Sequence, residues 1–266
     1  MKSEAAAPQW VYGMSTTSAA GDKILSANCV NGSWRLNLLT CDGLVVDLKQ
    51  PFDDLSGINA HFDRAVAIAS NPVTGAGLLE MDLKLGSWNH SPASLPVLQE
   101  SYISVPEPFW FEGYKGQLTH SWYYPPSNGT TEPAPLLVKS HSGPTAMASS
   151  GLNLGIQFWT SRGWGVVDVN YGGSTGFGRS YRERLQFGWG EVDVFDCAAA
   201  AKALVDLGKV DRQRIAIEGG SAGGFTTLAC LCFTDVFCVG ACRYAVSDLI
   251  AMSKDTHRFE AGYLDH

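Results

Sequence analysis

The chain has 266 residues, of which 45% are hydrophobic and 17% are charged, with a formal net charge of -7. These proportions are typical of a folded, core-forming protein and exclude a disordered chain. The acidic balance argues against nucleic acid and anionic membrane surfaces as partners, because both require clustered lysine and arginine. We expect a peptide, protein or small-molecule partner, and the sequence leaves oligomerisation open.

Targeting signals and metal motifs are not expected. Residues 1–22 lack the apolar stretch of a signal peptide, and no run approaches the roughly 18 apolar residues of a spanning helix. A cytoplasmic location is expected, with an organelle as the alternative. No CxxC or zinc spacing occurs, so we expect reduced core thiols and no metal or cofactor. The buried helix and strand predicted near the end contain Cys230, Cys232, Cys238 and Cys242.

The first hundred residues consist of short β segments divided by turns. One group of expected strands is 23–27, 35–39 and 44–48. The dipeptides Asn31-Gly32 and Asp42-Gly43, typical of hairpin turns, divide them into an antiparallel meander. A similar group, 65–69 and 77–83, follows about 40 residues later, and this period is typical of propeller blades. We predict a partial β-propeller over residues 1–100, with a small open sheet as the alternative.

Strands and helices alternate in the rest of the chain, after a Ser-, Pro- and Asn-rich connection over residues 87–108. Strands are expected at 117–124, 136–140, 165–169, 214–218 and 239–246. Helices are expected at 152–162, 190–207 and 225–232. The central strands are continuously apolar, as in strands buried on both faces. We therefore predict an α/β fold with a parallel sheet over residues 101–266.

A serine lies where a predicted strand turns into a helix. Residues 215–218 lead directly into Gly219-Gly220-Ser221-Ala222-Gly223, the strand, turn and helix context of a G-x-S-x-G nucleophile elbow. The glycines suit a strained turn in which strand and helix approach closely. Ser221 is the candidate nucleophile, and the N–H groups at the helix start are candidate oxyanion donors. A structural glycine-rich turn is the alternative.

Two further loops follow apolar strands. His141-Ser142-Gly143-Pro144 stands where α/β-hydrolases place a second oxyanion donor, which makes the Gly143 N–H a candidate; an ordinary turn is the alternative. His141 precedes the serine, whereas the general base of this fold follows it, so we expect His141 to be structural and hydrogen-bonded within its loop. The glycine-rich loop over residues 170–178 lacks the Lys-Ser/Thr pair of a phosphate-binding loop.

The motifs HSGP, NYGGSTGFG and GGSAGG, in this order, resemble the catalytic domain of the prolyl oligopeptidase family, in its acylaminoacyl-peptidase and dipeptidyl-peptidase-like branch. The resemblance covers residues 101–266, and the blade-like segment fits the propeller that precedes this domain in the family. It implies Ser221 as nucleophile and the N–H groups of Ala222 and Gly143 as oxyanion donors. It also implies that Tyr171 forms a substrate-binding wall of the entrance.

The chain departs from the family pattern in two places. The family's HGGP reads HSGP, with Ser142 in place of glycine, so we expect a tilted loop that keeps its donor. A serine nucleophile also needs a histidine held by a carboxylate. In the family both follow further strands that this chain does not contain. A substitute pair could combine Asp248, Asp255 or Asp265 with His257 or His266. No spacing brings such a pair over Ser221, and residues 247–249 resemble a segment that covers the active site.

We therefore predict a serine peptidase, shortened at the C-terminus and also at the N-terminus, that hydrolyses short peptides through an acyl-enzyme on Ser221 and is impaired here. The expected fold is an incomplete α/β-hydrolase domain preceded by a partial β-propeller, with an unpaired sheet edge prone to aggregation. The alternatives are a carboxylesterase on the same fold and a non-catalytic interaction protein.

Overall fold

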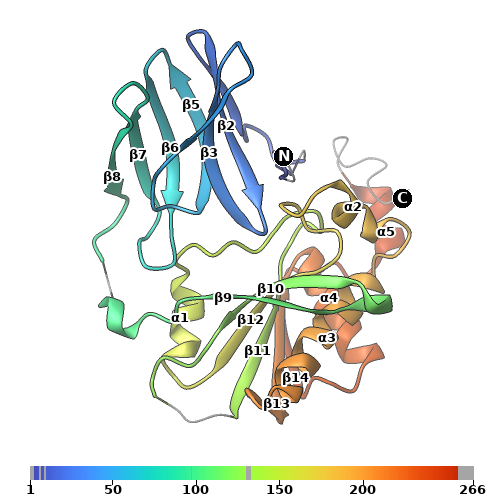
Figure 1. Ribbon diagram of the computed structural model, residues 1–266. Coiled ribbons are helices and arrows are strands. Elements are labelled where there is room, and N and C mark those ends of the chain that lie inside the picture. Colours follow the sequence, from blue (N-terminus) through green and yellow to red (C-terminus); the bar gives the residue numbers. More distant parts are fainter. Residues whose placement is uncertain (1–2, 6, 9, 97, 130–132, 257–266) are drawn as a thin grey trace. The chain divides into compact units, whose positions relative to one another are not determined.

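The computed structural model describes residues 3–5, 7–8, 10–96, 98–129 and 133–256 (Figure 1). The chain divides into two compact units. The first comprises Met1–Ile103, Ser149–Leu154 and Thr175–Gly178, and the second comprises Ser104–Ala148, Gly155–Ser174 and Arg179–His266. Residues 141–144, 170–174 and 219–224, which include every predicted site residue, belong to the second unit.

Two four-stranded antiparallel sheets make up the first unit. The first sheet contains β1 (Thr17–Ala20), β2 (Lys23–Val30), β3 (Ser33–Leu39) and β4 (Val45–Leu48). The second contains β5 (Asp54–His61), β6 (Arg64–Ser70), β7 (Gly77–Asp82) and β8 (Ser87–Pro92). Each strand pairs with the next along the chain. Asn31 and Gly32 both have positive φ, as a two-residue hairpin turn requires, so the predicted meander is confirmed.

The predicted connection over residues 87–108 is wrong at both of its ends. Strand β8 occupies Ser87–Pro92 and pairs with β7, and β9 begins at Glu107. Between them lies a short 3-10 helix, η1 (Glu100–Tyr102). Strand β8 is exposed along nearly its whole length, so its sequence carries no apolar alternation that would mark a strand.

A six-stranded sheet forms the centre of the second unit, in the order β14-β13-β11-β12-β10-β9. The strands are β9 (Glu107–Glu112), β10 (Leu118–Tyr124), β11 (Ala134–Ser140), β12 (Gly165–Asn170), β13 (Val210–Gly220) and β14 (Val239–Arg243). The neighbours from β12 to β14 pair in parallel, but β9 and β10 are antiparallel. The predicted parallel sheet is therefore mixed, because the short connection through η2 (Tyr114–Gly116) permits only antiparallel pairing.

Helices cover both faces of this sheet. Alternate strand residues point to opposite sides, so the apolar strands present side chains that must be buried on each face. Leu136, Val138, Ile215 and Ile217 pack with α3 (Val192–Asp206) and α4 (Ala222–Phe233). Leu137 and Ala216 pack on the other side with Ile156 of α1 (Leu154–Thr160). The remaining helices are α2 (Arg179–Arg182), η3 (Glu183–Leu185) and α5 (Leu249–Asp255). Within the described ranges, no helix is long and apolar enough to cross a membrane.

Strand β14 lies at the edge of the sheet and is largely exposed. It ends at Arg243, before the predicted boundary, because Tyr244 has a φ of 40° that leaves the extended region. The expectation of core thiols in this region is corrected. Cys230 is buried, but Cys232 near the end of α4, Cys238 and Cys242 are exposed. The prediction assumed that neighbouring elements would bury β14, but β14 is the edge strand of the sheet.

Candidate active site

Ser221 lies between β13 and α4 with φ 52° and ψ -120°, a conformation that costs a non-glycine residue about 1–3 kcal/mol. Three backbone hydrogen bonds hold it there. The Ser221 N–H donates to the Arg243 carbonyl at 3.1 Å, and its carbonyl accepts from the N–H groups of Phe225 and Val246 at 3.1 and 3.2 Å. The surrounding structure thus imposes the sharp turn predicted for a nucleophile elbow.

The glycines around Ser221 leave no room for side chains. A Cβ on Gly219 would lie 2.2 Å from the Gly223 carbonyl oxygen. A Cβ on Gly223 would lie 2.1 Å from the Ser140 oxygen, and one on Gly224 2.6 Å from the Cβ of Ala245. Real Cβ atoms do not approach other atoms this closely, so the strand, the helix and the end of β11 can meet only if these positions are glycine.

Ala222 is the first residue of α4, a helix of 12 residues. Its N–H belongs to the first turn and cannot have a partner within the helix, and the helix dipole places partial positive charge there. The position of Ala222 therefore suits a backbone donor directed at negative charge that develops on a substrate bonded to Ser221.

The loop after β11 comes to the elbow. Gly143 has φ 140°, and a Cβ there would lie 2.8 Å from the Thr145 nitrogen. At the start of the loop, the carbonyl oxygens of Ser140 and His141 abut Gly223, since they would lie only 2.1 and 2.8 Å from a Cβ at that position. The structure thus brings the HSGP loop and the serine turn together, because both follow the carboxyl ends of the adjacent parallel strands β11 and β13.

His141 has a structural position, as predicted. Its Nδ1 lies 2.8 Å from the Ser142 carbonyl oxygen, and its Nε2 lies 2.7 Å from the Ser174 hydroxyl. The ring stacks on Tyr171 at a centroid distance of 4.2 Å. Desolvation lowers the pKa of His141 to about 4, so the imidazole is neutral at neutral pH and both nitrogens are engaged within the loop region.

Tyr171 is fully buried, whereas the sequence led us to expect a wall of the entrance. Its hydroxyl donates to the His141 carbonyl at 2.9 Å and lies 3.3 Å from the Pro144 carbonyl. The Tyr171 hydroxyl therefore holds the loop at His141, before Gly143, and at Pro144, after it. In this structure Tyr171 supports the loop through its hydroxyl.

Two buried aspartates of α3, which the sequence analysis did not single out, also support the site. Asp193 accepts from the Gly190 N–H at 2.7 Å and from the Thr226 hydroxyl at 2.5 Å, which links α3 to α4 behind Ser221. Burial raises the pKa of Asp193 to about 6. Asp196 accepts from the Gly172 N–H at 2.7 Å and from Arg184 at 3.0 Å, which anchors the loop that follows Tyr171.

The alternative acid Asp248 acts as a helix cap. Its Oδ1 accepts from the N–H groups of Ile250 and Ala251 at 2.9 and 3.0 Å, at the start of α5. Asp255 is the last residue of that helix. The predictions that concern His257, Asp265 and His266 fall outside the described residues. The described part of the chain contains no cluster of His, Cys, Asp or Glu that could hold a metal ion.

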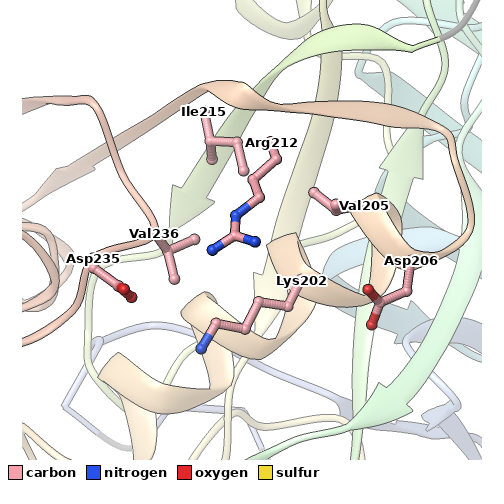
Figure 2. Close-up of a pocket in the computed structure, with 7 residues that line it drawn as sticks. All are labelled: Lys202, Val205, Asp206, Arg212, Ile215, Asp235 and Val236. Atoms are coloured by element: carbon pink, nitrogen blue, oxygen red, sulfur yellow. The ribbon is translucent and has the colours of Figure 1, made fainter.

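A cavity of about 210 Å³ lies elsewhere, near the start of β13 (Figure 2). It is lined by Lys202, Val205, Asp206, Arg212, Ile215, Asp235 and Val236. Ser221 follows the other end of the same strand, roughly 30 Å from Arg212 at the usual rise of an extended strand. The cavity is therefore separate from the candidate active site.

The profile of the prolyl oligopeptidase family matches residues 150–266, which include the serine turn and the glycine-rich loop. Residues 150–266 therefore match a prolyl oligopeptidase family domain. It is 36% identical to dipeptidyl peptidase family member 6 of Caenorhabditis elegans over 45% of this chain and 16% of that protein. It is also 36% identical to acylamino-acid-releasing enzyme 1 of Oryza sativa, over 35% of this chain and 12% of that protein.

Among solved structures, a puromycin-hydrolyzing peptidase of Mycobacterium tuberculosis superposes with a TM-score of 0.92 and 38% identity, over 99% of this chain and 42% of that protein. This likeness confirms the predicted fold class, part of a propeller followed by part of an α/β-hydrolase domain. The matched regions span less than half the length of each of these relatives.

Proposed function

We propose that this prolyl oligopeptidase family chain carries the nucleophile and oxyanion hole of a serine peptidase. Ser221 attacks the carbonyl carbon of a peptide or aminoacyl amide, and the N–H groups of Ala222 and Gly143 bind the oxyanion that forms. The observation that carries the proposal is the strained backbone of Ser221 at the junction of strand and helix, beside the Gly143 loop.

The proposed chemistry also needs a general base. Four histidines lie in the described ranges, and His61 and His90 belong to the first unit. His120 is fully buried, and both nitrogens of His141 are engaged in its loop. We therefore propose that the general base and its carboxylate lie outside the described ranges.

The proposed substrates are short peptides and aminoacyl amides. The support comes from the relatives, which are named as a dipeptidyl peptidase, an acylamino-acid-releasing enzyme and a puromycin-hydrolyzing peptidase.

We further propose that residues 1–100 form propeller blades and residues 101–266 the catalytic domain. A cytoplasmic location is proposed on the seven free thiols, which suit a reducing compartment.

Covalent labelling tests the proposal most directly. A fluorophosphonate probe should label the protein at Ser221, and the Ser221→Ala variant should remain unlabelled. Release of p-nitroaniline from aminoacyl p-nitroanilides should be lost in the same variant, by a factor of about 1,000 or more if the wild-type protein turns over. Hydrolysis of p-nitrophenyl esters without any amide hydrolysis would support an esterase instead. Labelling that persists in Ser221→Ala would refute the assignment of the nucleophile.

A further inference from the structure

The HSGP loop is hydrogen-bonded to residues at the end of β12 and just after it. Tyr171 bonds the carbonyls of His141 and Pro144, and Ser174 bonds the His141 ring. Further along, the Asn170 side chain accepts from the Ala148 N–H at 2.7 Å and donates to the Ala148 carbonyl at 3.1 Å. All three partners lie at the end of β12 or just after it, so these bonds fix the loop relative to β12 and not relative to Ser221.

A different bond joins the loop to the elbow. The Ser142 hydroxyl donates to the Gly220 carbonyl oxygen at 2.8 Å. Ser142 directly precedes Gly143, and Gly220 directly precedes Ser221. The Gly143 N–H belongs to the peptide unit that begins at Ser142, and the Gly220 carbonyl belongs to the peptide unit that ends at Ser221. This hydroxyl therefore links the two peptide units on either side of the reaction centre.

Glycine at position 142 could not make this bond, because glycine has no side chain. The nearest other side-chain bond is that of the Ser140 hydroxyl to the Gly223 carbonyl at 2.8 Å, but Ser140 is the last residue of β11. That bond therefore fixes the end of the strand to α4 and does not connect the loop beyond it to the elbow. The serine that led us to expect a tilted loop thus makes a directional hydrogen bond to the elbow, next to the proposed donor Gly143.

We propose that Ser142 is a positioning residue, whose hydroxyl holds the Gly143 N–H at a fixed distance from Ser221. The inference rests on the proposed function. Ser142 itself need not touch the substrate. An oxyanion donor acts fully only when it is already directed at the position that the oxyanion will occupy, and displacement by about 1 Å is costly. The tether is exposed, so it contributes geometry more than stability.

The first measurement is hydrogen exchange of the backbone amides in the full chain. In Ser142→Ala and Ser142→Gly, the amides of Gly143, Thr145 and Ala146 should exchange at least about threefold faster than in the wild type, because a tethering hydrogen bond is lost. Ser142→Thr retains a hydroxyl and should restore slow exchange. The matched control is Ser161→Ala, which removes another exposed serine hydroxyl that donates to a backbone carbonyl, that of Phe158 at 3.1 Å. It should leave residues 143–146 unchanged.

The second measurement is the hydrolysis of aminoacyl p-nitroanilides. Ser142→Ala should lower kcat about tenfold with KM within about twofold, because the donor acts only on the transition state. Ser142→Thr should recover most of kcat, and Ser161→Ala should match the wild type. An unchanged kcat in Ser142→Ala, or a loss confined to KM, would overturn the inference, since the latter indicates direct contact with substrate.

The two proposals fail in different ways. If the wild type neither turns over nor reacts with a fluorophosphonate, the proposed peptidase is refuted, and the exchange data alone then decide whether Ser142 tethers the loop. If the wild type is active, the kcat of Ser142→Ala relative to the wild type decides whether Ser142 positions the donor. Exchange rates that are equal in Ser142→Ala and Ser161→Ala would refute the tether in either case.

Discussion

The backbone of Ser221 adopts a conformation that glycine reaches freely and other residues reach only under strain. Ser221→Gly should relieve this strain, whereas Ser221→Ala should keep it. We expect Ser221→Gly to exceed Ser221→Ala in free energy of unfolding by about 1 kcal/mol, measured by urea denaturation, although neither can react. At Ser161, where φ is not positive, the order should reverse, with alanine more stable than glycine. An alanine variant at position 221 as stable as the glycine variant would contradict the strain.

His120 gives the fold a sensitivity to acid. It is fully buried, and its Nδ1 lies 3.2 Å from the Asn170 amide nitrogen, so this nitrogen accepts and the ring is neutral. Desolvation lowers the pKa of His120 to about 3, whereas an unfolded histidine has a pKa of about 6.5. The unfolded state therefore takes up the proton first. Stability that depends on the neutral ring is complete above about pH 6.5 and is lost progressively as the pH falls towards 3.

His120→Asn tests this sensitivity, because asparagine offers an acceptor in place of Nδ1 but does not titrate. Between about pH 7.5 and about pH 5, the wild type should lose about 2 kcal/mol more free energy of unfolding than the variant. Urea denaturation at the two pH values measures this difference. Equal losses in both proteins would show that His120 is not held neutral by the fold.

At the scale of elements, runs of apolar residues predicted most strands, including the exposed β4 and β14, and strands without such a run were missed. Strands β11 and β12 were predicted within two residues, because both of their faces carry apolar side chains. Strand β8 was missed because both of its faces are exposed, and β5 because Gly57 and polar residues interrupt it. The antiparallel β9 was missed for a third reason, since the prediction placed a connection there.

Helix α3 is held to its surroundings by a buried ion pair. Asp196 is fully buried and accepts from Gly172, Tyr114 and Arg184. Asp196→Ala would leave Arg184 buried without its counter-ion, so we expect a loss of about 3–5 kcal/mol in free energy of unfolding. Glu183→Ala, which breaks the exposed pair with Arg179, should cost less than about 0.5 kcal/mol. Chemical denaturation of both variants compares the two, and similar losses would contradict the importance of burial.

At the scale of the whole molecule, the seven free cysteines divide by exposure. Cys41, Cys232, Cys238 and Cys242 are exposed, and Cys29, Cys197 and Cys230 are buried. Burial also raises the pKa of the Cys29 thiol, to about 12, which suppresses the reactive thiolate. An excess of a thiol reagent should therefore modify four groups quickly in the native protein and seven after denaturation. Fast modification of all seven would show that the core opens readily.

The sequence could predict those parts of the candidate site that strand topology places, but not those whose role depends on which side chains are buried. Gly143 and Ser221 could be predicted near each other because parallel strands deliver their following loops to one edge of the sheet. The support from Asp193 and Asp196 was missed, although a signal existed. Both share a helix face with the apolar Cys197 and Ala200, and a carboxylate on a buried face requires partners. The burial of Tyr171 followed from side-chain packing that no local pattern encodes.

The crowding of the glycines around Ser221 has a consequence for how the motif responds to selection. A mutational scan scored by protein abundance should find Gly219, Gly223 and Gly224 intolerant of every side chain, whether or not catalysis is required. The same scan should find Ser221 tolerant of glycine. Scored by hydrolysis, all four positions become intolerant. Purifying selection on the glycines therefore reports only that the fold is kept, and retention of the serine is the sign that the chemistry is kept as well.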